Sequence, residues 1–297
     1  MKKLVSMSLA LALILSLAGC GSSGADKSAA AQSSAQSSAS QSAAEPAGEE
    51  PVELVVYAAA SMTETLSAIA EQYKDVAPNV TLVYNFASSG DLLKQIQEGA
   101  DCDLFISAAP KQMNALDGSL KDDADKNPNG LDEIVVDSRI DLLENKVTLA
   151  VPDGNPKGIE SFDQLAELLK SGDVFLAMGN SDVPVGQYTQ KIFDYYGLNE
   201  EEMAASGVLT YGSNVKEVTT HVSEAAVDCG IIYATDAFSA GLSVVDGATA
   251  EMCGQVIYPA AVLKNSRHPD EAQAFLDYLT GDEADAVFES VGFTPLA

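Results

Sequence analysis

Hydrophobic and polar residues follow two different periods along the chain after residue 51. Leu54–Tyr57 is a continuous apolar run rich in β-branched residues, which predicts a buried strand. After the small residues Ala58–Ala60, apolar positions recur at helical spacing over Ser61–Lys74, which predicts a helix. Ser61 and Glu64 have the spacing of a capping box, so we predict that Ser61 caps this helix.

The same succession of strand, short turn and helix recurs to the end of the chain. The further predicted strands are Val80–Phe86, Leu104–Ser107, Val147–Val151, Val174–Met178, Leu209–Tyr211, Cys229–Tyr233 and Gln255–Leu263. The further predicted helices are Asp91–Glu98, one that begins at Pro110, Ser161–Lys170, Tyr188–Tyr196, Lys216–Ala226 (with Asn214 as its N-cap and Glu217 three residues later), Pro269–Leu279 and Asp282–Val291. Strands that alternate with helices predict an α/β fold with mostly parallel sheets. Two such series, before and after about residue 147, predict two lobes.

The first twenty residues have the composition of an export signal. Two lysines precede the apolar run Leu4–Leu17, which is too short to span a membrane. The run ends in Leu17-Ala18-Gly19-Cys20, which resembles the lipobox of bacterial lipoproteins. That resemblance implies a signal peptide over residues 1–19 and a lipid on Cys20, which would anchor the protein to the outer face of the bacterial cell membrane. An ordinary signal peptide with a chance cysteine is the alternative.

A segment of low complexity separates this signal from the predicted fold. Residues 21–50 are mostly Ser, Ala, Gln and Gly and contain no Leu, Ile, Val, Met or aromatic residue. Such a composition cannot bury apolar surface, so we predict a flexible tether over residues 20–51.

The charge and the counts of His and Cys exclude several classes of function. A formal net charge of −28 argues against nucleic-acid binding, which needs clustered Lys and Arg. The 2 histidines are too few for a His-rich metal site, and the 4 cysteines form no CxxC motif. We favour Cys229 with Cys253 if any pair forms a disulfide, although free thiols are at least as consistent with the sequence.

No set of residues in the sequence supports the hypothesis that the protein is an enzyme. Ser61 is a possible nucleophile for a hydrolase or transferase, but it lacks a G-x-S-x-G elbow and no histidine is nominated as its base. The glycine-containing turn Gly179–Gln187 lacks the Lys-Ser/Thr ending of a P-loop. We therefore predict that the protein is not an enzyme.

Four similar corners of the predicted fold favour the hypothesis that the protein binds a ligand. Each corner joins a strand to a helix and offers backbone N–H groups, small residues and often a hydroxyl: Ala58–Ser61, Ala87–Gly90, Pro184–Gly186 and Ser213–Val215. Tyr233, at the end of a predicted strand, adds a phenol. None of the corners contains Lys or Arg. Sites that only donate hydrogen bonds favour an oxyanion without a proton, such as sulfate or molybdate, over hydrogen phosphate.

Several stretches together resemble the periplasmic molybdate-binding proteins of molybdate ABC importers, within the type II solute-binding proteins. These stretches are VVYAAASMTETL, NFASSGDLLKQIQEGADCDLFISA, SDVPVGQY, SNVKEV, GIIYATDA and QAFLDYLTGDEADAVFESVGF. The resemblance implies that the oxyanion, molybdate with its molybdenum, is held by the hydroxyls of Ser61, Ser89 and Tyr233 and by the backbone N–H groups of Val185 and Val215. The chain departs from the family at Gly90, where a third Ser is common, at Val185, which replaces a smaller residue, and at Ala234-Thr235, where Gly-Ser is common.

The same resemblance implies a fold, a partner and a way of working. It implies a two-lobed type II periplasmic-binding-protein fold with the ligand in the cleft, lobe I comprising residues 52–147 plus 255–297 and lobe II residues 148–254. It further implies closure of the lobes around molybdate or tungstate, delivery to an ABC permease subunit, a monomer, and no cofactor beyond the ligand. A sulfate or other oxyanion binder of the same fold is the alternative.

Overall fold

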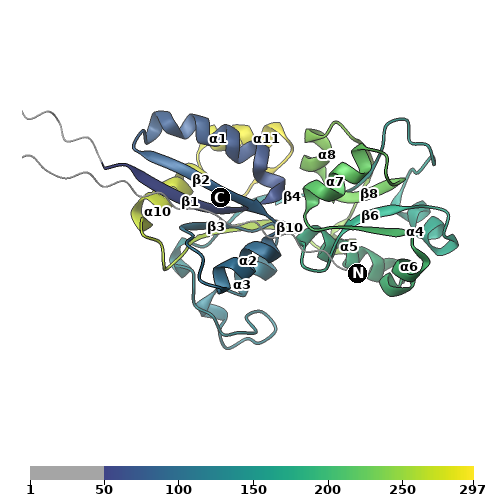
Figure 1. The fold of residues 1–297 in the computed structure, drawn as a ribbon, viewed down its shortest axis with the longest axis horizontal. Helices are drawn as coiled ribbons and strands as arrows, with labels where there is room; N and C mark the ends of the chain where they lie inside the picture. The colour runs from purple at the N-terminus through teal and green to yellow at the C-terminus, as the bar shows by residue number, and fades with distance from the viewer. Residues whose placement is uncertain (1–49) are drawn as a thin grey trace, which may run out of the picture. The chain divides into compact units, whose positions relative to one another are not determined.

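The computed structural model describes residues 50–297 (Figure 1). The predicted signal peptide, the predicted lipidation site Cys20 and nearly all of the predicted tether lie outside these residues. Within the described part, none of the helices combines the length and the apolar character that crossing a bilayer requires.

The first of two sheets contains six strands in the order β11-β4-β10-β3-β1-β2. These strands are β1 (Val52–Ala59), β2 (Val80–Ala87), β3 (Leu104–Ile106), β4 (Ile140–Asn145), β10 (Val256–Val262) and β11 (Thr294–Pro295). β1 to β4 run in one direction and β10 and β11 run in the other. Its helices are α1 (Thr63–Val76), α2 (Ser89–Gln97), α3 (Pro110–Asn114), α10 (Pro269–Tyr278) and α11 (Asp282–Ser290). In Figure 1, α1 and α11 cover one face of the sheet, and α2 and α3 lie on the other.

The second sheet contains five strands in the order β7-β6-β8-β5-β9. They are β5 (Val147–Val151), β6 (Leu176–Gly179), β7 (Leu209–Gly212), β8 (Cys229–Tyr233) and β9 (Ser243–Gly247), and only β5 runs against the rest. The helices are α4 (Phe162–Ser171), α5 (Pro184–Tyr196), α6 (Glu200–Ser206), α7 (Val215–Ser223), α8 (Ala234–Ser239) and α9 (Ala250–Cys253). The predicted α/β class with two helix-flanked sheets, most of whose strands are parallel, is confirmed.

The chain passes from the first sheet to the second at a single residue. β4 ends at Asn145 and β5 begins at Val147, so Lys146 alone separates the two strands. The chain returns between β9 and β10, through the short helix α9. Asn145 and the beginning of β10 therefore lie where the two sheets are joined.

Apolar faces of the predicted helices supply much of the core. On α1, Leu66 and Ile69 are fully buried, and the ring of Tyr73 packs edge-on against Phe275 of α10 at a centroid distance of 4.9 Å. Full burial of each such aliphatic side chain contributes about 1.5–3 kcal/mol. The helical spacing seen in the sequence is thus the spacing of the buried face.

The capping prediction for Ser61 is wrong, whereas that for Asn214 is confirmed. Ser61 lies in a short 3-10 helix, Ala60–Met62, and makes no capping bond to α1. Its hydroxyl is instead within 2.9 Å of the Tyr258 hydroxyl, 197 residues away in the sequence. Asn214 accepts a hydrogen bond from the backbone N–H of Glu217 at 3.1 Å, as an N-cap does.

Three further findings differ from the sequence-based predictions or add to them. The favoured Cys229–Cys253 disulfide is wrong, because both residues, like Cys102, are buried free thiols. Cys229 opens β8 with its thiol near the carbonyl of Phe175, whereas the Cys253 thiol lies near the carbonyl of Thr249. Strands β4, β9 and β11 and helices α6, α8 and α9 were not predicted, since they are short or have charged or polar residues between their apolar positions.

Candidate functional site

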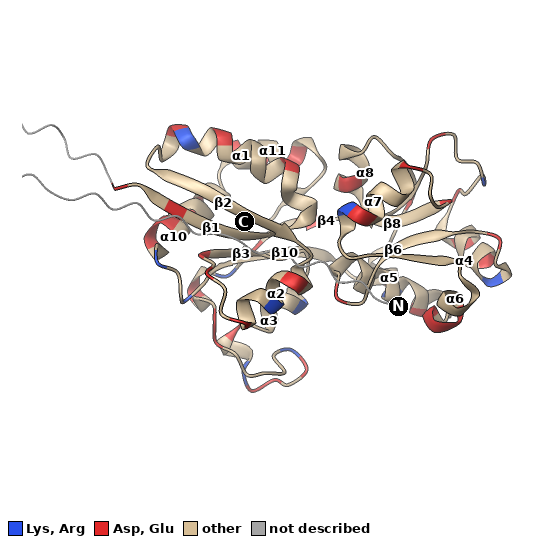
Figure 2. Ribbon diagram, viewed as in Figure 1, with Lys and Arg blue, Asp and Glu red and all other residues tan. Residues whose placement is uncertain are grey.

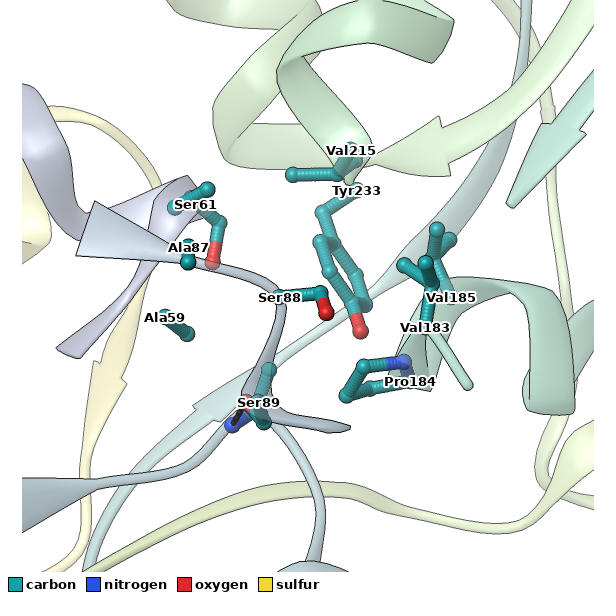
Figure 3. Close-up of a pocket in the computed structure, with 12 residues that line it drawn as sticks. Ala59, Ser61, Ala87, Ser88, Ser89, Val183, Pro184, Val185, Val215 and Tyr233 are labelled. Carbon is teal, nitrogen blue, oxygen red and sulfur yellow. Dashed lines mark hydrogen bonds between the residues drawn. The ribbon is translucent and has the colours of Figure 1, made fainter. Parts of the chain in front are cut away.

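One pocket brings all four predicted corners and Tyr233 together. It is lined by Ala59, Ala60, Ser61, Ala87, Ser88, Ser89, Ala108, Val183, Pro184, Val185, Val215 and Tyr233. Figure 3 shows the serines on one side and Tyr233, Val185 and Pro184 facing them. The cavity volume is about 10 Å³, far below the range of about 300–1,000 Å³ typical of sites for drug-sized ligands. The pocket therefore suits a small guest held by both sheets.

Helix N-termini surround this pocket. α2 begins at Ser89, α5 at Pro184 and α7 at Val215, and each of these residues lines the cavity. The first N–H groups of a helix have no acceptor within the helix, and the helix dipole makes that end attractive to anions. The backbone N–H groups of Val185 and Val215 belong to such first turns. A hydrogen bond from either N–H group to an anion does not need the valine side chain.

Two buried serine hydroxyls on the first sheet contribute further polar atoms. Ser89 follows β2, is fully buried, and its Oγ accepts a hydrogen bond from the backbone N–H of Ala108 at 2.9 Å. Ser61 follows β1, and its Oγ is paired with the hydroxyl of Tyr258. Ser88 also lines the pocket, but its hydroxyl caps α2 by accepting from the N–H of Asp91 and donating to the Asp91 carboxylate.

Tyr233, at the end of β8, has a hydroxyl that forms no hydrogen bond with any described residue. Its side chain is 1% exposed, and its Oη has no hydrogen-bond partner among residues 50–297. Burial raises the pKa of this phenol well above its ordinary value, so it keeps its proton at neutral pH and acts as a donor. A buried donor without an acceptor is costly, and a ligand in the pocket would satisfy it.

Charged side chains are absent from the pocket wall formed by the described residues. Figure 2 shows acidic residues spread over the helices of both sheets, but Asp91 is engaged in the cap of α2, and Asp182 pairs with Lys94 at 2.6 Å. The site thus relies on neutral donors, as the corners predict. Within residues 50–297 no group of three or more His, Cys, Asp or Glu is placed to hold a metal ion directly.

Three polar contacts join the side of the molecule that holds the first sheet to the side that holds the second. Lys94 of α2 pairs with Asp182, Lys216 of α7 pairs with Glu64 of α1 at 2.7 Å, and Gln112 of α3 donates to Gln187 of α5 at 3.3 Å. Such contacts require the two sheets to approach closely, so this arrangement is closed around the pocket.

Gly90 has a steric reason to lack a side chain. A Cβ atom at this position would lie 2.1 Å from the carbonyl oxygen of Asp182, on the opposite side of the pocket. The departure from Ser at position 90 therefore allows a closer approach of α2 to the segment ahead of α5.

The structure brings together all five predicted ligand residues, Ser61, Ser89, Val185, Val215 and Tyr233. It also identifies two residues that sequence reasoning missed, Tyr258 and Asn145, which contact Ser61 directly or through one another. No local signal marks either residue, because both act over more than 100 positions of sequence. Neither histidine lines the pocket, so Ser61 has no histidine base within it.

Comparison with known families agrees with this geometry. The family model for bacterial extracellular solute-binding proteins matches residues 54–294, so the chain belongs to that family. The chain is 34% identical over 245 residues to YvgL of Bacillus subtilis (strain 168), provisionally named an ABC transporter substrate-binding lipoprotein; the match covers 82% of this chain and 86% of YvgL. It is 32% identical over 248 residues to the molybdate-binding protein ModA of Escherichia coli (strain K12), covering 82% and 89%.

Solved structures show the same fold. A substrate-binding domain from Clostridium difficile, provisionally assigned to a molybdenum ABC transporter, matches with a TM-score of 0.60 and 30% identity, over 83% of this chain and 100% of that one. The periplasmic molybdate-binding protein of Azotobacter vinelandii matches with a TM-score of 0.66 at 19% identity, over 82% of this chain and 100% of that one. The sulfate-binding protein SubI of Mycobacterium tuberculosis matches with a TM-score of 0.61 at 20% identity, over 82% of this chain and 87% of that one, so this fold serves more than one oxyanion.

Proposed function

We propose that the protein captures molybdate, and tungstate as well, outside the cytoplasm and delivers it to the permease of an ABC importer. The observation that carries the proposal is the buried Tyr233 hydroxyl, which has no hydrogen-bond partner among residues 50–297, in a small pocket walled by neutral donors. Relatives at 31% and 32% identity that are named molybdate-binding proteins support the choice of anion.

In this proposal five groups hold the anion. The hydroxyls of Ser61, Ser89 and Tyr233 and the backbone N–H groups of Val185 and Val215 each donate a hydrogen bond to an oxygen of the anion. Hydrogen bonds to a charged partner are each worth about 1.5–3 kcal/mol when they replace contacts with water. No cofactor is needed, because binding uses only the protein's own donors.

Binding and closure are coupled because the donors come from both sheets. Ser61 and Ser89 follow strands of the first sheet, and Val185, Val215 and Tyr233 belong to elements of the second. An anion that contacts both sets favours the closed arrangement over any open one. In the proposal the protein is a monomer, and its closed form docks on the permease. The hinge residues are those where the chain passes between the two sheets.

Calorimetric titration of the purified protein with molybdate, tungstate, sulfate and phosphate tests the proposed ligand. We expect molybdate and tungstate to bind more tightly than sulfate, and phosphate to bind least. Tighter binding of sulfate would favour the alternative of a sulfate binder in the same fold, and no binding of any oxyanion would overturn the proposal.

We also propose that a lipid on Cys20 anchors the protein to the outer face of the cell membrane. Cys20 follows a lipobox-like sequence, and a relative of 34% identity carries a provisional lipoprotein name. Cys20→Ala should move the protein from the membrane fraction to the medium or periplasm, without changing its affinity for molybdate. Retention of the variant in the membrane fraction would contradict the anchor.

A further inference from the structure

A buried chain of polar side chains leads from the pocket to the segment that joins the two sheets. Ser61 Oγ lies 2.9 Å from Tyr258 Oη, and Asn145 Nδ2 lies 3.2 Å from the same Tyr258 oxygen. Asn145 Nδ2 also donates to Thr235 Oγ1 at 2.9 Å. All four side chains are at least 95% buried, so water does not compete for these hydrogen bonds.

The orientation of the Asn145 amide is set by the backbone. Its Oδ1 accepts a hydrogen bond from the N–H of Lys146 at 2.8 Å, so its Nδ2 is the atom that faces Tyr258 and Thr235. An amide nitrogen only donates, which makes the Tyr258 oxygen an acceptor in this contact.

Ser61 is the second hydrogen-bond partner of the Tyr258 hydroxyl. Burial raises the pKa of Tyr258 well above its ordinary value, so the phenol keeps its proton. The contact between Tyr258 and Ser61 allows either hydroxyl to donate, and the bond from Asn145 favours Tyr258 as the donor because its oxygen already accepts. Ser61 thus accepts in this bond, and its own proton is free to point into the pocket.

We infer that Tyr258 and Asn145 are positioning residues that make Ser61 a donor and so exclude oxyanions that carry a proton. This inference rests on the proposed function and names the residues that set its specificity. Ser89 has the same polarity by a different route, because the backbone N–H of Ala108 occupies its Oγ as a donor. Tyr233, with no partner among the described residues, is the third hydroxyl that can donate.

The consequence is a pocket in which the hydroxyls of Ser61, Ser89 and Tyr233 all donate to the guest, while that of Ser88 is engaged with Asp91. A sulfate or molybdate dianion accepts from all of them. A hydrogen-phosphate dianion of equal charge brings one O–H group, which meets donors only and leaves one hydrogen bond unmade. That mismatch corresponds to a discrimination of about tenfold or more.

Asn145→Asp tests the inference by reversing the direction of the hydrogen bonds that link residue 145 through Tyr258 to Ser61. A carboxylate at this position only accepts, so Tyr258 would turn its proton toward it, and Ser61 would donate to Tyr258 and present a lone pair to the pocket. The measurement is competition of sulfate and of phosphate against molybdate in mildly alkaline buffer, where phosphate is mainly a dianion. We expect the preference for sulfate over phosphate to fall by about tenfold or more.

The ratio of the affinities for sulfate and for phosphate distinguishes a positioning role of Asn145 and Tyr258 from a merely structural one. A general loss of structure or an added negative charge weakens the binding of both dianions together and leaves their ratio unchanged. Tyr258→Phe, which lets Ser61 either donate or accept, should lower the ratio in the same direction but by less. Tyr84→Phe is the matched control, since that hydroxyl donates to the carbonyl of Leu66, away from the pocket, and its loss should leave the ratio unchanged.

The outcomes distinguish this inference from the proposed function. If the unmodified protein fails to bind molybdate, the proposed function is wrong. If the unmodified protein binds molybdate but both Asn145→Asp and Tyr258→Phe exclude phosphate as completely as it does, the inference is overturned while the proposed function remains. Should Asn145→Asp fail to fold, the ratio measured for Tyr258→Phe decides by the same criterion.

Discussion

At the scale of single residues, the site depends on which polar atoms have partners and which do not. The hydroxyls of Ser61 and Ser89 each have one partner, whereas that of Tyr233 has none among the described residues. A buried polar atom that finds its hydrogen-bond partner only in a ligand lowers the stability of the ligand-free protein and raises the affinity for the ligand. Removing that atom should therefore change stability and affinity in opposite directions.

Tyr233→Phe should separate these two effects. Affinity for molybdate should fall by about 10- to 100-fold, because one hydrogen bond to a charged guest is lost. The melting temperature of the ligand-free protein should stay the same or rise, because the buried hydroxyl has no hydrogen-bond partner to lose within the described part of the chain. Calorimetry and thermal melting measure the two quantities, and a large drop in the melting temperature without ligand would contradict this account of Tyr233.

Asp236, in the first turn of α8, is a buried carboxylate with incomplete pairing. Neither of its oxygens has a hydrogen-bond partner among residues 50–297, although the ammonium of Lys216 lies 3.0 Å from one of them as an ion pair. Burial raises the pKa of Asp236 to about 6, and Lys216 opposes part of that rise. The pKa of Lys216 is raised in turn: burial lowers it, but Asp236 and Glu64 more than offset the burial.

Asp236→Asn should therefore stabilise the protein in a way that depends on pH. The folded state binds the Asp236 proton more tightly than the unfolded state, whose carboxyl titrates near its ordinary value of 3.8, so the free energy of unfolding falls as pH rises between about 4 and about 6. Above that window the charged carboxyl costs about 3 kcal/mol. The variant should melt at a higher temperature than the unmodified protein above about pH 6, and at the same temperature near pH 4. A lower melting temperature at both pH values would show that Lys216 needs this partner.

At the scale of elements, the pocket depends on how closely helix starts from the two sheets can approach. α2 meets the segment ahead of α5 at Gly90, and α7 meets α1 through Lys216 and Glu64. The first contact is backbone against backbone, with no room for a side chain. The second is an ion pair between long side chains, which can adjust.

Gly90→Ala should impair closure. The added Cβ would lie 2.1 Å from the Asp182 carbonyl oxygen, so α2 must move away from the opposite wall of the pocket. Since overpacking costs about 1–3 kcal/mol, we expect affinity for molybdate to fall by about 5- to 150-fold. Gly247→Ala is the matched control, because nothing lies within 4 Å of the Cβ added there and its affinity should be unchanged. Equal affinities for the two variants would disprove the steric argument.

At the scale of the whole described fold, residues 50–297, binding and stability are linked because the ligand would contact both sheets. A ligand that binds only the folded state adds about 2.7 kcal/mol at a concentration of about 100 times its Kd. For a protein of this size, each kcal/mol corresponds to roughly 2–4 °C in melting temperature. Because the ligand also favours the closed arrangement, binding should change the dimensions of the protein as well as its stability.

Molybdate at about 100 times its Kd should accordingly raise the melting temperature by roughly 5–10 °C. It should also reduce the radius of gyration measured by small-angle scattering, because it favours the closed arrangement. Phosphate at the same concentration is the control and should do neither. A rise in melting temperature without any change in the radius of gyration would contradict the coupling of binding to closure.

Much of the local structure followed from the sequence. The positions of most helices and strands, the corners between them and the Asn214 cap depend on residues that are neighbours in the chain, so pattern and spacing predict them. The five proposed ligand residues were nominated in the same way, with the help of a family resemblance. The failures, the Ser61 cap and the Cys229–Cys253 disulfide, concern partners chosen by packing.

The sequence by itself determined the chemical character of the corners: small residues, hydroxyls and helix N-termini without Lys or Arg. Only the tertiary structure decided which hydroxyl protons are free to reach a guest, that Asp236 is buried beside Lys216, and that Gly90 touches the opposite wall. The physical reason is that a hydroxyl can donate or accept, and its choice depends on partners such as Tyr258 that the fold brings from far along the chain.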